Sequence, residues 1–198
     1  MHTPQGVFSA PHIVVCPGTD IVSLFPDAFR ARGTGLCKLH VLRLAAPGWT
    51  LPAPVMSDPG LHRYRGYHAA ASLTALRVRL AREQPAQLEH GVHLIVVQSA
   101  DGSLVVGDSH HDAPTPDPFQ PKAVDALILD EFAAVLGAPP PVIDRWVGVY
   151  PIGPEDAFIE APMPGVRLVS VTSGTGASTA FGLAEEVLAD LMGMEIAA

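Results

Sequence analysis

The chain has 198 residues, of which 48% are hydrophobic and 16% are charged. This composition is typical of a chain that buries a core, and it excludes disorder throughout the length. The formal net charge of −8 argues against a nucleic acid or an anionic membrane surface as the partner, because both attract clustered Lys and Arg. A small molecule is the partner that we expect.

The cysteine content and the first residues indicate a compartment. Only Cys16 and Cys37 are present, and their spacing predicts neither a disulfide framework nor a zinc site. The amino terminus lacks the basic and apolar regions of a signal peptide, and no stretch approaches the roughly 20 apolar residues of a membrane helix. We therefore expect a cytoplasmic protein with reduced thiols.

The first part of the chain predicts a strand, a helix and a second strand. Residues 11–17, PHIVVCP, are a short apolar run of the kind found in buried strands. Thr19 or Asp20 can cap a helix that ends near Gly33. Residues 37–44, CKLHVLRL, alternate apolar and polar side chains, which predicts a half-buried antiparallel strand.

The middle of the chain predicts a hairpin that follows a helix. After a proline-rich loop at 46–59, we predict a strand over 61–67 and an amphipathic helix over 68–83. Residues 92–98 and 104–107 are predicted to form a hairpin, because the Asp-Gly pair between them supplies the residues that a tight turn requires.

The last part of the chain predicts a helix over 123–136 and strands over 142–149 and 166–172. A glycine turn, SGTG, then leads into a helix over 179–191. Since hairpins are mixed with helices instead of strictly alternating βα units, we predict an α+β fold with an antiparallel sheet in the middle.

The run DSHHD, residues 108–112, contains metal-ligating residue types. Adjacent strand residues point to opposite faces, so His110 and His111 cannot both hold one ion there, although Asp108, His110 and Asp112 could share a face. We expect a polar strand end beside a pocket and no metal. Either histidine would then be available for acid–base chemistry.

Other catalytic motifs are absent from the sequence. It has no GxSxG nucleophile elbow and no Walker P-loop. The turn GTGAST has the first two glycines of a dinucleotide fingerprint, but Thr179 stands where the third is expected. The residues of the turn are equally compatible with a ligand cradle and with an ordinary strand–turn–helix element.

Three segments resemble the flavoprotein family of D-amino-acid oxidase, glycine oxidase and sarcosine oxidase. They are HLIVVQSADGSLVVGDSHH at 93–111, RWVGVYP at 145–151 and VTSGTGASTAFGLAEEV at 171–187. Together they look most like a subgroup associated with aminophosphonate breakdown. The resemblance implies FAD as cofactor and oxidation of a small amine or amino acid, such as 2-aminoethylphosphonate, to an imine by hydride transfer.

The resemblance also implies a domain arrangement. Residues 1–35 and 145–198 would belong to an FAD-binding domain, and residues 36–144 would form the antiparallel substrate-binding sheet. Family members begin with a βαβ unit whose GxGxxG motif holds the FAD pyrophosphate, and this chain lacks it, so we expect a truncated form. The alternative is a non-catalytic fragment, or a subunit that binds FAD only beside a second chain or in a homo-oligomer.

Carried over by position, the glycine turn implies cofactor contacts. Gly174, Thr175, Gly176, Ala177 and Ser178 would place backbone N–H groups and a helix N-terminus near the flavin pyrimidine edge. Negative charge develops there when the flavin is reduced, so the helix dipole would favour hydride acceptance.

The resemblance assigns the remaining site residues as well. Gly148 and Tyr150 would lie along the isoalloxazine or the substrate pocket, and His110 would be the catalytic residue. Arg63 or Arg65 would bind the substrate anion, because Arg matches a carboxylate or phosphonate bidentately.

Overall fold

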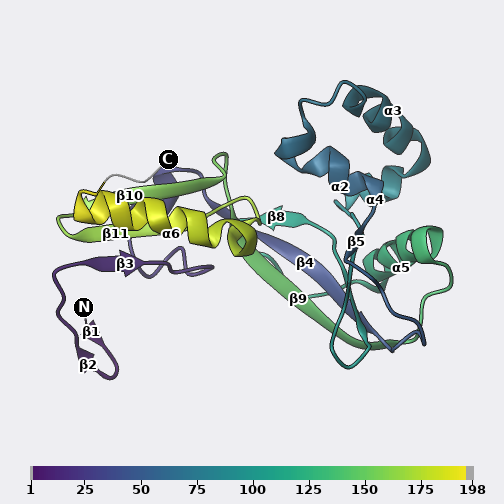
Figure 1. Cartoon of the computed structure of the whole chain (residues 1–198), viewed down its shortest axis with the longest axis horizontal. Coiled ribbons are helices and arrows are strands. Elements are labelled where there is room, and N and C mark those ends of the chain that lie inside the picture. Colours follow the sequence, from purple (N-terminus) through teal and green to yellow (C-terminus); the bar gives the residue numbers. More distant parts are fainter. Residues whose placement is uncertain (1, 195–198) are drawn as a thin grey trace. The chain divides into compact units, whose positions relative to one another are not determined.

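The computed structural model describes residues 2–194, and Figure 1 shows their helices and strands. The chain separates into two compact units. One is continuous and spans residues 37–149, whereas the other combines the segment before residue 37 with the segment after residue 149. The chain passes between the units in strands β4 (Gly35–Leu44) and β9 (Val142–Ile152).

The continuous unit is built on a sheet whose pairings confirm the predicted α+β fold. Its strand order is β5 (Val55–Met56), β6 (Ile95–Gln98), β7 (Leu104–Gly107), β4 and β8 (His111–Ala113), and β9 also pairs with β4. The β5–β6, β6–β7 and β7–β4 pairs are antiparallel. The predicted hairpin is present, with Gln98 paired to Leu104 across the Asp-Gly turn.

Helix α5 (Lys122–Leu136) packs its apolar side chains on this sheet and confirms the helix predicted over 123–136. Ile128 and Phe132 of α5 are fully buried against strand residues. The strand and loop residues of this core are Leu42, Leu44, Val92, Leu94, Val96, Leu104 and Val106.

Strand β4 is antiparallel as predicted, but its buried face differs from the one that the alternation indicates. Lys38 and His40 are buried on the same strand as Leu42 and Leu44, whereas Leu39 is only half-buried. The polar pair is tolerated because each side chain finds a partner: the Lys38 Nζ atom lies 2.8 Å from Asp117 Oδ2, and His40 Nδ1 lies 3.3 Å from Asp125 Oδ1.

The segment predicted as a strand over 61–67 is helical, and that prediction is wrong. Helix α2 spans Asp58–Arg63 and a 3₁₀ turn, η1, spans Arg65–Tyr67. The helix begins before the window that we took as a strand, with Pro59 in its first turn, where the fixed φ of proline suits a helix start. The helix predicted from residue 68 begins later, as α3 (Leu73–Glu83), followed by α4 (Pro85–Glu89).

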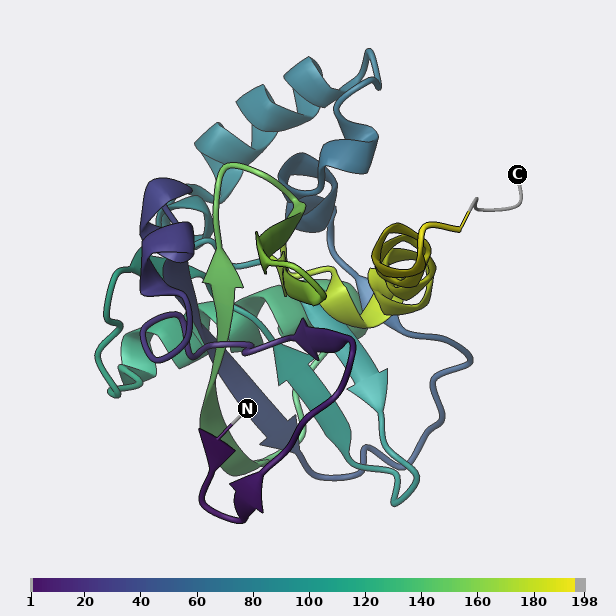
Figure 2. The same cartoon turned by 90° about the vertical axis from the view of Figure 1, so that its left-hand side faces the viewer.

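Figures 1 and 2 both show α2, α3 and α4 grouped together at one end of the continuous unit. This helical group is formed by one uninterrupted stretch of chain between β5 and β6. It brings Arg63 and Arg77 to a pocket that His93, just before β6, also lines.

The discontinuous unit contains a smaller sheet in the order β10 (Ala157–Met163), β11 (Val166–Val171) and β3 (Ile13–Val15). The β10–β11 pair is antiparallel, and β3 joins β11 in parallel, so the two chain segments of the unit meet in this sheet. Phe29, Phe158 and Leu168 form its core. A short hairpin of β1 (His2–Thr3) and β2 (Gly6–Val7) precedes β3.

Two helices belong to the discontinuous unit. Helix α1 spans only Pro26–Ala31 and does not begin at Thr19 or Asp20 as predicted. Phe25, just before the helix, is left-handed (φ 54°), and Pro26 stands at the helix start, where its fixed φ is suited. Helix α6 (Gly176–Met192) follows β11, as predicted from the glycine turn. Among the described residues, no helix is long and apolar enough to cross a membrane.

The packing of α5 can be tested by truncation. Phe132→Ala should destabilise the protein by about 3–5 kcal/mol, because it leaves a cavity in the core of the continuous unit. Val135→Ala is the matched control, since Val135 is on the same helix and 43% exposed. Urea unfolding of both variants measures the difference, and equal small losses would show that α5 does not pack as described.

Candidate functional site

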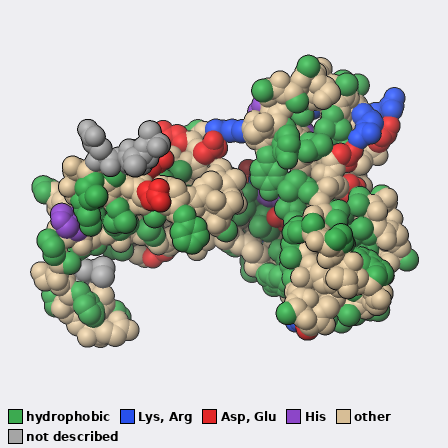
Figure 3. Space-filling view, in the orientation of Figure 1, with side chains coloured by type: hydrophobic (Ala, Val, Ile, Leu, Met, Phe, Trp, Pro, Cys, Tyr) green, Lys and Arg blue, Asp and Glu red, His purple; other side chains and the backbone are tan. Residues whose placement is uncertain are grey.

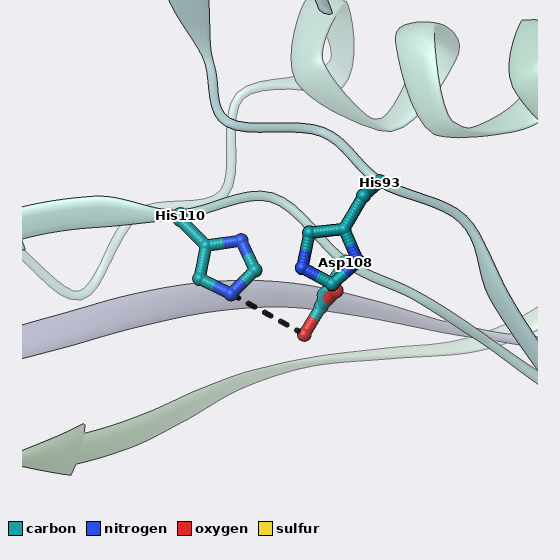
Figure 4. Close-up of side chains that lie close together, drawn as sticks. All are labelled: His93, Asp108 and His110. Atoms are coloured by element: carbon teal, nitrogen blue, oxygen red, sulfur yellow. Dashed lines mark ion pairs between the residues drawn. The ribbon is translucent and has the colours of Figure 1, made fainter. Parts of the chain in front are cut away.

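Three ionisable side chains come together where the β6–β7 hairpin opens. His93 lies just before β6, Asp108 directly follows β7, and His110 lies between β7 and β8. The His93 N–H donates to the Asp108 carbonyl and the Asp108 N–H to the His93 carbonyl, each at 3.1 Å. This reciprocal backbone pair holds the two side chains at the same edge of the sheet (Figure 4).

The polar atoms of this trio face one another. His93 Nε2 lies 3.6 Å from Asp108 Oδ1, and His110 Nε2 lies 3.8 Å from Asp108 Oδ2. The two imidazole rings are stacked, with centroids 4.6 Å apart. His110 Nδ1 lies 2.9 Å from the carbonyl oxygen of Gly91, which assigns the ring proton to Nδ1 and turns Nε2 toward Asp108.

Burial sets the charge state of the trio. The side chains of His93, Asp108 and His110 are 2%, 17% and 6% exposed. Burial raises the pKa of Asp108 to about 7, although the positive charge of Arg63 opposes this. Burial, followed by the charge of Arg63, lowers the pKa of His93 to about 4 and that of His110 to about 3. Both histidines are therefore neutral at neutral pH.

A pocket of about 340 Å³ lies beside the trio and shares His93 with it. Besides His93, the polar residues that line the pocket come from α2, α3 and the turn between them: His62, Arg63, His68 and Arg77. The described lining contains no carboxylate. The Arg77 Nε–H donates to His62 Nδ1 at 3.1 Å. A small cavity with this lining suits an anionic ligand.

His111 belongs to a different group from its neighbour His110. Its ring lies 5.3 Å from that of His40 and 5.5 Å from that of His90, and its Nε2 is 3.1 Å from Ser109 Oγ. His40 is in turn hydrogen-bonded to Asp125, which also accepts hydrogen bonds from Gln120 and Arg145. We interpret this second group as a buried polar network that joins β4 to α5.

The structure separates the other sequence-predicted residues of the continuous unit. Arg63 and Arg65 are both exposed, but Arg63 lines the pocket and Arg65, in η1, is not among the residues that line it. Gly148 lies on β9 opposite β4, where a Cβ would meet the Leu39 side chain at 3.5 Å. Asp112 is exposed and does not join Asp108 and His110.

The predicted cofactor turn lies in the discontinuous unit. Gly174 has a positive φ of 76°, and a Cβ there would lie 3.2 Å from the Tyr150 ring, so these two predicted residues are in close contact. Thr175 precedes α6, and its carbonyl accepts bonds from the N–H groups of Ser178 and Thr179. Gly176 and Ala177 form the first turn of α6 with Ser178.

His93 is the residue of the trio that the sequence analysis missed. The one feature of the sequence that could have indicated His93 is its position just before the first strand of the hairpin, because Asp108 follows the second strand directly. An unbroken register from the Ile95–Gly107 pair would place Ser109 opposite His93. A shift of one residue places Asp108 there instead, and the sequence does not show this shift.

With the fold and the site described, comparison with known proteins identifies the class. Residues 8–191 match the FAD dependent oxidoreductase (DAO) family. The chain therefore belongs to this family, which confirms the flavoprotein family expected from the sequence. No curated protein matches the chain.

Several solved structures are similar to the chain. Glycine oxidase from Bacillus cereus has a TM-score of 0.66 at 13% identity, with 98% of this chain and 46% of that one covered. Glycine oxidase from Geobacillus kaustophilus gives 0.63 at 16% identity, covering 99% and 45%. L-proline dehydrogenase from P. horikoshii gives 0.66 at 14% identity, covering 95% and 44%. At these identities they show a shared fold, and the chain spans less than half the length of each.

The raised pKa of Asp108 predicts a pH dependence of stability. The folded protein holds this proton with a pKa of about 7, against a usual value of 3.8, so the contribution of Asp108 to stability should fall as the pH rises through this window. The lowered pKa values of His93 and His110 act in the opposite direction, so the comparison with a variant isolates the contribution of Asp108. Asp108→Asn removes the ionisation and should gain stability relative to the parent as the pH rises, by at most about 1.4 kcal/mol per pH unit.

The measurement is urea unfolding between pH 4 and 7, with a chelator present so that no cation neutralises the carboxylate. Asp112→Asn is the control, because it removes an exposed carboxylate from the same segment, and its trend should be much smaller. If the stabilities of the parent and of Asp108→Asn changed with pH in parallel, the Asp108 carboxyl would not be held in its protonated form by burial.

Proposed function

We propose that the chain provides the substrate-binding sheet and part of the FAD-binding domain of an oxidoreductase that oxidises a small, anionic amine or amino acid. The observation that carries this proposal is the pocket with two arginines, beside buried His and Asp side chains, in a chain of the FAD dependent oxidoreductase family. The proposed domains are residues 1–35 and 145–198 for the cofactor and 36–144 for the substrate.

The pocket supports a small anion as part of the substrate. Its volume of about 340 Å³ is at the low end for ligand sites. The similar structures carry the names glycine oxidase, L-proline dehydrogenase and iminodiacetate oxidase, and each named substrate bears a carboxylate. We propose an amino-acid carboxylate or the phosphonate of an aminophosphonate as the group that binds Arg63, with Arg65 as the second candidate.

The glycine turn before α6 fits the proposed cofactor. Gly174 packs against Tyr150 and needs its positive φ, and the turn leads directly into a helix of 17 residues. Such a helix presents N–H groups and a partial positive charge to an electron-rich edge. We propose that Gly174, Thr175, Gly176, Ala177 and Ser178 contact FAD in this way.

When bound, FAD would accept a hydride from the substrate carbon and pass the electrons to oxygen or another acceptor. The amine must also lose a proton for the C=N bond of the imine to form, and water then hydrolyses the imine. We propose His110 as the residue that accepts this proton, because burial keeps its imidazole neutral and the Gly91 carbonyl holds the ring proton on Nδ1, so that Nε2 is the basic nitrogen. Gly148 and Tyr150 remain proposed contacts of the flavin or the substrate.

A second chain or a second copy is the alternative for completing the cofactor site. The chain spans less than half of the similar structures. Within the discontinuous unit, α6 also exposes large apolar side chains, among them Phe181 (88%), Leu188 (45%) and Met192 (54%). Figure 3 shows hydrophobic side chains on the face of this unit that is turned to the viewer. An apolar face of this kind is typical of a surface that another segment covers.

We also propose a cytoplasmic location, which the two free cysteines support.

Flavin binding tests the proposed cofactor turn. A Cβ on Gly176 would make only ordinary contact with Val171, at 3.6 Å, so Gly176→Val should fold but block close approach of a ligand to the backbone. We expect the parent to perturb the absorbance bands of added FAD and Gly176→Val to lose this effect. Gly182→Val is the matched control, because Gly182 is on the same helix and has nothing within 4 Å.

The three possible results distinguish the proposals. Equal FAD binding by the parent and Gly176→Val would assign the turn a purely structural role. Loss of binding in Gly182→Val as well would point to the helix and not to the turn. No binding by the parent would favour the alternative, in which a second chain is required.

The pair Arg63→Gln and Arg65→Gln tests the anion pocket. Arg63→Gln should weaken binding of the substrate anion by about tenfold or more, since a hydrogen bond to a charged group is worth about 1.5–3 kcal/mol. Arg65→Gln should bind nearly as well as the parent. Calorimetric titration with glycine and with 2-aminoethylphosphonate measures both effects and shows which anion is preferred; an equal loss in both variants would place the anion outside this pocket.

A further inference from the structure

The side chains of His93, Asp108 and His110 have the arrangement of metal ligands. One nitrogen or oxygen atom from each lies within 4.8 Å of the other two. Zn²⁺ binds such atoms at about 2.0–2.2 Å, which separates two ligand atoms of a tetrahedral site by about 3.4 Å. His93 Nε2 lies 3.6 Å from Asp108 Oδ1, and His110 Nε2 lies 3.8 Å from Asp108 Oδ2. The two imidazoles thus approach different oxygens of one carboxylate, and side-chain movement would bring one atom of each residue to a common ion.

The hydrogen bonds around the trio orient its side chains. His110 donates its Nδ1 proton to the Gly91 carbonyl, the kind of contact that orients a metal-binding imidazole and presents its Nε2. Both ring nitrogens of His93 and the Oδ1 atom of Asp108 are buried and have no hydrogen-bond partner among the described residues. Buried polar atoms without partners are costly, and a shared cation would satisfy one nitrogen of His93 together with this oxygen.

We propose that His93, Asp108 and His110 form a binding site for a divalent transition-metal ion of the zinc type. Two imidazoles and one carboxylate favour Zn²⁺ or Co²⁺ over Mg²⁺ or Ca²⁺, which prefer oxygen ligands. His93 also lines the pocket, so an ion can enter from that side and keep a water molecule as its fourth ligand. From the DSHHD run alone we expected a polar strand end beside a pocket and no metal, and the fold adds His93, from outside that run, to Asp108 and His110.

The charged and titratable groups that face the trio limit its affinity. The Arg63 side chain of α2 is near enough to influence the pKa of all three residues, and its charge opposes a cation. Tyr64 also faces the trio, with its ring 5.6 Å from that of His93. Within the trio the carboxylate of Asp108 is the one negative group, and the exposed Asp112 adds a weaker attraction at His110. Because the charge of Arg63 opposes a cation, we expect a reversible site and not a permanently filled structural one.

The metal site goes beyond the proposed oxidase function and does not depend on it. One consequence does rest on that function: an ion on His110 Nε2 would occupy the nitrogen proposed to accept the substrate proton. Bound Zn²⁺ should then inhibit oxidation. Failure of this inhibition alone would count against the role of His110 in catalysis, whereas the metal site is tested by direct binding.

The test is titration of the tag-free full chain with Co²⁺ after treatment with a chelator. We expect the visible absorption of a tetrahedral Co²⁺ site, with a single ion per chain, and its loss when Zn²⁺ is added. Asp108→Asn and His93→Gln should each weaken Co²⁺ binding by about tenfold or more. His111→Gln is the matched control, because this neighbour of His110 lies in the other histidine group, and it should bind like the parent.

A second measurement guards against variants that fail to fold. Zn²⁺ should raise the melting temperature of the parent, since a ligand that binds only the folded state stabilises it, and His111→Gln should keep this rise. The proposal is overturned if the parent binds no Co²⁺ stoichiometrically and shows no rise with Zn²⁺. It is also overturned if His111→Gln loses binding as much as the folded Asp108→Asn variant does.

Discussion

The reciprocal backbone bonds between His93 and Asp108 organise the whole candidate site. At the open end of the β6–β7 hairpin they pair the strands with a shift of one residue relative to the Ile95–Gly107 pair. This shift places two ionisable side chains opposite each other. The next residue, Leu94, is hydrogen-bonded to Ser57, which leads into α2. The Leu94 N–H donates to Ser57 Oγ, and the Leu94 carbonyl accepts from the Ser57 N–H, both at 3.0 Å. His93 therefore lies between the helical group and the hairpin.

Gly91 completes this arrangement. It has a φ of 56°, and a Cβ on it would lie 2.9 Å from the Cβ of His110. Only glycine allows the turn before β6 to approach His110 so closely, and the same approach lets the Gly91 carbonyl accept the His110 Nδ1 proton. The backbone thus determines which nitrogen of His110 faces Asp108. Both the proposed proton transfer and the proposed metal site depend on that nitrogen.

Arg63 links the two proposed properties of the site. Its charge favours an anionic substrate in the pocket, and the same charge opposes the ionised histidines and a cation in the trio. Asp108 is the only acidic member of the trio, and burial favours its protonated form. An anion bound to Arg63 would offset this positive charge and so reduce the repulsion that a cation in the trio meets.

Local pattern by itself determined the elements whose signals lie within a few residues. The Asp-Gly turn between β-branched runs determined the β6–β7 hairpin, helical spacing determined α5, and the glycine turn determined where α6 follows β11. The quoted motifs also determined the family, and placed His110 and Arg63 among the candidate residues. These features need no information about distant partners, because turn chemistry and side-chain periodicity are local properties.

Only the tertiary structure decided the features that depend on distant partners. Lys38 and His40 are buried because Asp117 and Asp125 lie within reach, and alternation along β4 cannot show this. The strand expected over 61–67 is helical, since its helix starts before that window. His93 joins Asp108 and His110 through a register shift that the sequence does not signal. These features are stabilised by contacts between segments far apart in the chain, and a pattern within a few neighbouring residues carries no information about such contacts.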